Sequence, residues 1–319
     1  MAAKPPSRRL VGDIGGTNSR LGLFNASKNQ LSAVQSYTNS DFGELADVIT
    51  AWLDTLNGPP PNTACLAVAA PPFEDVVSML NIDWSFSCNQ LARDFGFSTL
   101  RCVNDFQGTA YALPHLQPVD VHTLRTSTSP PAKKLATVGP GTGLGGATLD
   151  YCRGSPVACA SEPGHMGLAP ATLLELELFR ALFPQHGEIH AELLVSGPGL
   201  GRLYRGLASV LGETPPERTP GEISTLAMTG ECEHCTRALE LFCGLLGSVC
   251  GDYVLATGSY GGLYLAGGIV PRMLSFIEKS SFRARFDAKG DMHAWLGRVP
   301  LHAITHPAAG LLGAAHAPL

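Results

Sequence analysis

A short segment near the start of the chain combines a carboxylate with paired glycines and two small polar residues. Asp13 is followed by Gly15 and Gly16, and then by Thr17 and Asn18. Glycines let backbone amides approach a phosphate closely, and a carboxylate can hold a hydrated Mg²⁺ opposite the phosphate charge. The segment therefore predicts a nucleotide site, although glycine turns of this kind also close ordinary hairpins.

A second glycine-rich turn follows the short apolar run Leu135–Val138 and contains Gly141, Thr142 and Gly143. The chain becomes strand-like again after it, which predicts a second strand, turn and strand. The glycines also satisfy the dinucleotide fingerprint of a dehydrogenase. A dinucleotide site requires a helix directly after the glycines, so the continuing strand disfavours a dehydrogenase. Tight binding of a nicotinamide cofactor would favour the dehydrogenase again.

A third glycine pair, Gly267 and Gly268, ends the apolar run 262–266 and precedes a helix that begins at Pro271. This order of strand, glycines and helix allows a nucleoside to lie against the backbone near a helix N-terminus. An ordinary strand-to-helix turn is the alternative when the pair is considered alone.

Asn104 and Asp105 follow a buried apolar run, Leu100–Val103. The end of a buried strand is the usual place for site residues in open α/β sheets. Asp105 is the candidate general base, because a hydroxyl that attacks a γ-phosphoryl group needs a carboxylate to accept its proton. The alternative for an Asn-Asp pair is a turn or a helix cap.

Three further polar side chains, Glu162, His165 and Glu192, lie beside predicted turns. Glu162 and His165 flank a Pro-Gly turn and could converge on one polyol. Sugar recognition needs many directed partners, because each hydroxyl must regain the hydrogen bonds that it loses on leaving water. A solvated Glu192 is the alternative.

Strand-like and helix-like segments alternate along the chain, which indicates an α/β fold. A capping box at Asp41–Glu44 precedes a helix that ends at Asn57–Pro61, and Cys65–Ala70 is a buried strand. The segments 173–183 and 235–256 are predicted helices. Thr126–Lys134 is rich in Thr, Ser, Pro and Lys, and is expected to be a mobile linker.

Composition excludes several classes of protein. A chain of 319 residues is expected to form two lobes, and the net charge of −5 without a basic cluster argues against nucleic acid as a partner. Glycines interrupt the most apolar stretch, 239–256, which favours a buried helix over a membrane span. The 9 cysteines have scattered spacing and fit a reducing cytoplasm. For Cys232–Cys235, a structural role is expected instead of zinc binding.

Taken together, these motifs resemble the bacterial-type glucokinase family of the sugar kinase, heat-shock ATPase and actin superfamily. The resemblance implies a two-lobed, ribonuclease H-like α/β fold of the actin-like ATPase kind with an interdomain cleft. It implies a small domain of residues 1–114 plus 302–319 and a large domain of residues 115–301. By position, it also assigns the sugar-binding residues Asn81, Asn104, Asp105, Glu162, His165 and Glu192.

The resemblance assigns ATP binding to three glycine-containing segments, and it allows Asp13 to hold Mg²⁺ through water. The assigned ATP-binding residues are Asp13, Gly15, Gly16, Thr17, Asn18, Gly141, Thr142, Gly143, Gly267 and Gly268. The implied activity is phosphorylation of D-glucose to glucose 6-phosphate, the first step of glycolysis, by a cytoplasmic homodimer with no nucleic-acid or membrane partner. The alternatives are a kinase for another hexose or an amino sugar, and a sensor that binds sugar and nucleotide without turnover.

Overall fold

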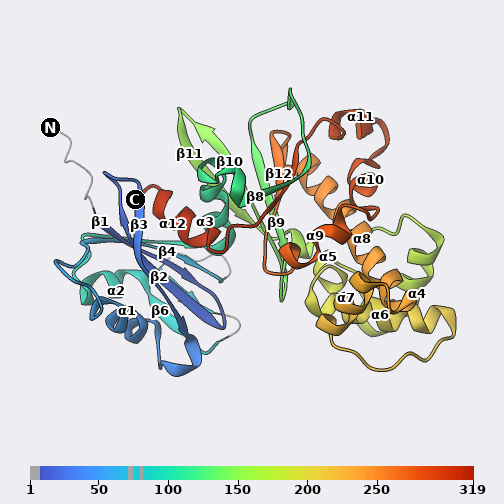
Figure 1. The fold of residues 1–319 in the computed structure, drawn as a ribbon, viewed down its shortest axis with the longest axis horizontal. Helices are drawn as coiled ribbons and strands as arrows, with labels where there is room; N and C mark the ends of the chain where they lie inside the picture. Colours follow the sequence, from blue (N-terminus) through green and yellow to red (C-terminus); the bar gives the residue numbers. More distant parts are fainter. Residues whose placement is uncertain (1–7, 71–74, 80–81) are drawn as a thin grey trace. The chain divides into compact units, whose positions relative to one another are not determined.

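The computed structural model describes residues 8–70, 75–79 and 82–319. The chain forms two compact units, each of which is described by itself below (Figure 1). The first unit contains Met1–Gln117, Tyr151–Ala160 and His306–Leu319, and the second contains Pro118–Asp150 and Ser161–Thr305. The sequence analysis had placed the segment Tyr151–Ala160 in the larger domain.

The first unit is built on a five-stranded sheet with the order β3-β2-β1-β4-β7. Its strands are β1 (Arg8–Ile14), β2 (Asn18–Asn25), β3 (Gln30–Thr38), β4 (Thr63–Val68) and β7 (Thr99–Asn104). Strands β1, β2 and β3 pair antiparallel, whereas β4 is parallel to both β1 and β7. The carboxyl ends of β1, β4 and β7 therefore lie along one edge of the sheet.

Helices and a small hairpin complete the first unit: α1 (Leu45–Leu53), β5 (Val76–Ser78), β6 (Ser85–Ser87), α2 (Cys88–Asp94), α3 (Asp105–Ala112) and α12 (Ala309–His316). Successive residues of β1 point to opposite faces of the sheet. Leu10 and Ile14 share a buried core with Trp52 of α1. Asp13 points to the other face, where it meets Gly310 of α12.

The start of α1 differs from the sequence prediction. Asn39–Asp41 form a short 3₁₀ helix, and α1 begins later, with Glu44 as its N-cap. The capping box is formed by Glu44 and Asp47. Since Asp47 accepts the backbone N–H of Glu44 at 3.1 Å, the predicted capping box at Asp41–Glu44 is wrong by three positions.

The second unit contains most of a six-stranded sheet with the order β11-β10-β9-β12-β13-β8. The strands are β8 (Val121–Arg125), β9 (Leu135–Pro140), β10 (Leu144–Cys152), β11 (Ser155–Ser161), β12 (Gly262–Leu265) and β13 (Leu301–Ile304). Strand β12 lies parallel to β9 and β13, and β10 is antiparallel to β9. Thr126–Lys134, predicted to be a linker, joins β8 to β9 within this unit.

The helices of the second unit are α4 (Leu173–His186), α5 (Ala191–Leu194), α6 (Gly197–Leu211), α7 (Pro220–Thr229), α8 (Glu233–Thr257), α9 (Val270–Ile277), α10 (Phe282–Asp287) and α11 (His293–Leu296). Among the described residues, α8 alone is long and apolar enough to cross a membrane, but 78% of its apolar window is buried inside the protein. It supplies core residues such as Phe242 and Leu246, which confirms the predicted buried helix.

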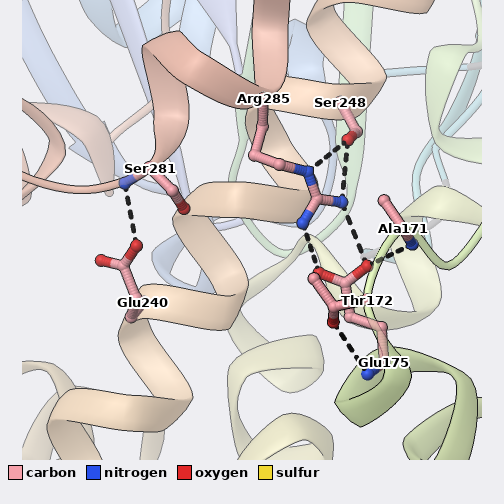
Figure 2. Close-up of polar contacts among 7 residues, drawn as sticks. All are labelled: Ala171, Thr172, Glu175, Glu240, Ser248, Ser281 and Arg285. Atoms are coloured by element: carbon pink, nitrogen blue, oxygen red, sulfur yellow. Dashed lines mark hydrogen bonds and ion pairs between the residues drawn. The ribbon is translucent and has the colours of Figure 1, made fainter. Parts of the chain in front are cut away.

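A buried ion pair ties three helices of the second unit together (Figure 2). Arg285 of α10 donates to the two carboxylate oxygens of Glu175 at 2.5 and 3.1 Å, and also to Ser248 Oγ of α8. Glu175 is 1% exposed and lies in the first turn of α4, where Thr172 Oγ1 accepts its backbone N–H. Its carboxylate also accepts the backbone N–H of Ala171 at 2.7 Å. The charges are therefore both paired and hydrogen-bonded, as buried charges must be.

Helices α3 and α12 of the first unit touch through their backbones (Figure 1). A Cβ atom on Gly313 of α12 would overlap the carbonyl oxygen of Gly108 on α3. A Cβ on Gly108 would in turn lie 2.7 Å from the Cβ of Ala67 on β4. Only glycine permits such an approach, so the sheet, α3 and α12 form one closely packed stack.

Gly313→Ala is expected to lower the free energy of unfolding by about 2 kcal/mol or more, because the new methyl group forces α12 away from α3. In a helix without this contact, the same change stabilises by up to about 1 kcal/mol. Gly221→Ala in α7 is the matched control, since the nearest atom to its added Cβ is 4.0 Å away. Urea unfolding of both variants makes the comparison, and equal effects would contradict the close packing.

Arg285→Met is expected to lower the free energy of unfolding by about 3 kcal/mol, because it leaves the buried Glu175 carboxylate without its cation. The control is Arg237→Met, which breaks an ion pair with Glu233 whose side chains are 50% and 79% exposed. The loss there should stay below about 0.5 kcal/mol. Thermal unfolding that ranks the two variants in the opposite order would refute the role assigned to Arg285.

Candidate active site

The first glycine turn joins β1 to β2 in the first unit, and a buried asparagine holds its shape. Asn39 is 1% exposed, and its Nδ2 donates to the carbonyl oxygen of Gly15 at 2.7 Å. Its backbone N–H donates to Thr17 O at 2.9 Å, and its Oδ1 accepts Ser19 Oγ at 2.7 Å. These bonds leave Thr17 and Asn18 exposed at the tip of the turn. The turn is thus held in a fixed shape with its tip open to solvent.

Sequence reasoning missed Asn39. The signal available was the run Asn39-Ser40-Asp41 directly after a strand, because Asn, Ser and Asp favour turns and bond to nearby backbone groups. Nothing local to that run indicates that its partner is a turn more than twenty residues earlier in the chain.

Asp13 lies at the end of β1, opposite Arg20 of β2. Its carboxylate rests on the start of α12, where a Cβ added to Gly310 would be 2.8 Å from Asp13 Cγ. Burial raises the pKa of Asp13 above its usual range, and the positive charge of Arg20 partly opposes that rise. A cation bound nearby would favour the charged carboxylate.

Asn104 and Asp105 meet at the junction of β7 and α3, as the sequence predicts for residues at the end of a buried strand. Asn104 is the N-cap of α3: its Oδ1 accepts the backbone N–H groups of Phe106 and Gln107 at 2.9 and 3.3 Å. Its Nδ2 donates to Ala70 O at 3.0 Å, which joins the ends of β4 and β7. The capping alternative is therefore correct for Asn104.

Asp105 is the first residue of α3, and its Oδ1 accepts the backbone N–H of Phe106 at 3.0 Å. A carboxylate in this position is favoured by the partial positive charge of a helix N-terminus. Because Gln107 donates to Ala158 O at 3.1 Å and also reciprocates the Asn104 cap, the first turn of α3 is fixed on both sides.

The second glycine turn joins β9 to β10 in the second unit, and two other segments converge on it. Gly141 accepts the backbone N–H of Gly197 at 2.8 Å, so the turn touches the first residue of α6. Gly267 has a φ of +86°, and a Cβ there would lie 2.7 Å from Pro140 O. The structure thus brings together Gly141–Gly143, Gly267–Gly268 and the N-terminus of α6.

Sequence reasoning treated the residues around Gly197 only as a turn. The structure makes them the start of a 15-residue helix, with Ser196 Oγ accepting the backbone N–H of Gly199 at 3.0 Å. Ser at the N-cap with Pro198 just inside the helix was the available signal. A helix N-terminus beside a glycine turn offers backbone N–H groups to an anion.

Glu192 connects this glycine turn to the third predicted ligand segment. Its Oε2 accepts the backbone N–H of Leu144 at 2.8 Å, directly after Gly143. A Cβ added to Gly164 would lie 3.1 Å from both Glu192 Cβ and Glu192 Oε2. Glu192 is partly buried between the two segments, so the alternative of a solvated Glu192 is wrong.

Glu162 directly precedes the short 3₁₀ helix Pro163–His165 and His165 is its last residue, and both side chains are exposed. The rings of His165 and His190 lie parallel, with centroids 5.7 Å apart. The structure therefore gathers Glu162, His165 and Glu192 around one turn of the second unit. The predicted Asn81 lies outside the described residues.

Glu192→Ala is expected to speed amide hydrogen exchange at Leu144 by about tenfold or more, since the amide loses a charge-assisted hydrogen bond worth about 1.5–3 kcal/mol. Glu192→Gln keeps an acceptor of similar length and should show a smaller effect. Glu188→Ala, at an exposed position of the same segment, should leave the exchange rate unchanged. Identical exchange in the Glu192→Ala variant and the unsubstituted protein would rule out this bond.

Two solved glucokinase structures share the fold of this chain. A solved glucokinase from an Antarctic psychrotroph has 39% sequence identity and a TM-score of 0.88 over 97% of this chain and 98% of that chain. A glucokinase of the ROK family from Streptomyces griseus, solved in complex with glucose and AMPPNP, has 18% identity and a TM-score of 0.63 over 97% and 98% of the two chains. The predicted α/β fold of the actin-like ATPase kind is confirmed.

Sequence comparison identifies the family. The family model described as glucokinase matches residues 10–318. A curated glucokinase from Saccharophagus degradans is 40% identical over 309 residues, which are 96% of each chain. Because both matches span nearly the whole chain, this protein belongs to the glucokinase family.

Proposed function

We propose that this protein transfers the γ-phosphoryl group of ATP to the 6-hydroxyl of D-glucose and so makes glucose 6-phosphate. The observation that carries the proposal is the position of Asp105 at the start of α3, in a chain of the glucokinase family. A hydroxyl nucleophile needs a carboxylate to accept its proton, and Asp105 supplies one at the carboxyl edge of the parallel strands.

The two glycine turns and the third glycine pair are proposed to bind ATP. In the second unit, Gly141–Gly143, Gly267–Gly268 and the start of α6 offer backbone N–H groups and an approach without side chains. In the first unit, the exposed tip of the turn held by Asn39 is proposed to contact the terminal phosphates. ATP and glucose are the ligands that the Streptomyces griseus structure, which holds glucose and an ATP analogue, also suggests.

Mg²⁺ fits the donor set around Asp13. Magnesium in phosphoryl-transfer sites is commonly held by one or two carboxylates, water and the phosphates of the substrate. Asp13 supplies such a carboxylate beside the first glycine turn, and a bound cation would favour the charged form that burial disfavours. When bound, the ion would neutralise phosphate charge and orient the phosphoryl group.

Asp105 is proposed to accept the proton of the sugar hydroxyl as the hydroxyl oxygen attacks the γ-phosphorus. Phosphoryl transfer has little covalent work for a protein to do, so catalysis rests mainly on position and charge. The Asn104 cap and the backbone N–H of Phe106 hold the start of α3, and so restrict where the Asp105 carboxylate can lie. Asp105 thus meets the hydroxyl from a fixed element.

Asn104 and Asp105 of the first unit are proposed as sugar-binding residues. Within the second unit, the proposed sugar-binding residues are Glu162, His165 and Glu192. Glu192 Oε2 is engaged by Leu144, so Oε1 would accept a sugar hydroxyl. The same carboxylate would then link the sugar to the second glycine turn. A homodimer in the cytoplasm is part of the proposal, and the 9 free cysteines support a reducing compartment.

Asp105→Ala is expected to lower kcat by about a hundredfold or more while the KM for glucose changes by less than about threefold, because a positioned base is lost but most sugar contacts remain. Asp94→Ala, at an exposed position of α2, is the matched control and should leave both constants unchanged. Steady-state rates with saturating ATP supply the test. A fall in kcat of less than about threefold would remove Asp105 from the role of base.

A further inference from the structure

Two cysteines of the first unit lie with their sulfur atoms in direct contact. Cys88 begins α2 and Cys102 lies on β7, and their Sγ atoms are 2.6 Å apart. That separation is only about half an ångström longer than the ~2.05 Å bond of a disulfide. All 9 cysteines are free thiols, so this pair is reduced but is already close to bonding distance.

The backbone on both sides of the pair is firmly held. Asp75 O accepts the backbone N–H of Cys88 at 3.0 Å, and the Asp75 carboxylate accepts Asn89 N and Ser87 Oγ at 2.8 and 2.7 Å. Cys102 is paired with Leu66 in the parallel register of β4 and β7. The sulfur atoms can therefore be joined without a large movement of either element.

The two thiols are chemically unequal. The hydrogen bond between the two thiols lowers the pKa of Cys88, although the Asp75 carboxylate acts in the opposite direction. The same hydrogen bond, together with burial, raises the pKa of Cys102. Cys88 is thus the better nucleophile and Cys102 its protonated neighbour, which is the division of labour found in redox-sensing pairs with a resolving cysteine.

We propose that Cys88 and Cys102 form a reversible disulfide when the protein meets hydrogen peroxide. The Cys88 sulfur attacks one peroxide oxygen, the O–O bond breaks, and Cys88 becomes a sulfenic acid as one water leaves. The Cys102 sulfur then attacks the sulfenic sulfur, its proton leaves with the hydroxyl as a second water, and the S–S bond forms. Two thiols are oxidised and one peroxide is reduced to two waters, and a dithiol reductant reverses the change.

The crosslink would act on the segment that carries the proposed base. Cys102 is two residues before Asn104, whose cap starts α3 at Asp105. Cys88 directly follows strand β6. A bond between them fixes the spacing of α2 and β7, and a displacement of less than 1 Å at a reacting group can change a rate many-fold. We therefore expect the oxidised protein to have a glucose kcat/KM lower by about threefold or more, an effect that rests on the proposed function.

The first test measures the bond itself. The purified full-length protein is treated with a small excess of hydrogen peroxide, unfolded, and alkylated at its remaining thiols. We expect a mass lower by about 2 Da before alkylation, two fewer alkylated cysteines, and a crosslinked peptide pair that contains Cys88 and Cys102. Dithiothreitol should restore the full number of alkylated cysteines.

Cys102→Ser and Cys88→Ser should abolish the crosslinked peptide, and Cys88→Ser should also abolish the sulfenic acid trapped by dimedone. The matched control is the double variant Cys232→Ser and Cys235→Ser, because these two cysteines are the nearest to each other along the sequence. It should still form the Cys88–Cys102 disulfide. A crosslink found at Cys232 and Cys235 instead, or no crosslink at all, would overturn the proposal.

The second test measures the effect on activity, and it separates the two claims. A disulfide that forms while the glucose kcat/KM stays unchanged would overturn the regulatory role and leave the redox chemistry intact. A disulfide that forms in a protein without sugar kinase activity would refute the proposed function alone. Loss of kcat/KM on oxidation that is absent in Cys102→Ser and reversed by dithiothreitol would support both claims.

Discussion

The contact between the backbones of α3 and α12 is the constraint on which the proposed chemistry depends. Gly108 and Gly313 allow the two helices to touch, and the same helix α12 presents Gly310 to the carboxylate of Asp13. The proposed base, Asp105, begins α3, and the proposed magnesium ligand ends β1. The closely packed stack of the sheet, α3 and α12 therefore positions both carboxylates relative to each other. Side chains at these glycines would separate the elements, so packing and catalysis depend on the same residues.

The proposed nucleotide site of the second unit consists mainly of backbone groups and not of charged side chains. The segments that meet there are a glycine turn, a glycine pair and the start of α6, which offer backbone N–H groups and a helix dipole to phosphate. Glu192 is the exception, and its carboxylate accepts the backbone N–H of Leu144. One hydrogen bond thus joins a proposed sugar-binding residue, Glu192, to the turn that is proposed to bind phosphate. Such coupling suits an enzyme that must use ATP only when sugar is bound.

Local patterns predicted the elements well but not the contacts between them. The strand, turn and strand at Asp13–Asn18 and the strand that ends before Asp105 follow from glycine chemistry and from apolar runs, both of which act over a few residues. Asn39 was missed because it bonds to Gly15 across 24 positions, and the partner of Glu192 is 48 positions away. The capping box was misplaced because Asp41 and Asp47 both suit a helix start, and only the path of the chain after β3 selects Asp47. Thr126–Lys134 has the composition of a linker, but the pairing of β8 with β13 keeps it within one unit.

The central claim is that this protein phosphorylates glucose with ATP. The most direct measurement is the release of ADP from ATP-Mg²⁺ with and without glucose, by a detection method that does not consume glucose 6-phosphate. We expect rapid release with glucose, slower release with mannose, fructose or N-acetylglucosamine at equal concentration, and almost none without sugar. A protein that binds both ligands in calorimetry but releases no ADP would contradict the account and identify a sensor, whereas a preference for another sugar would reassign the substrate.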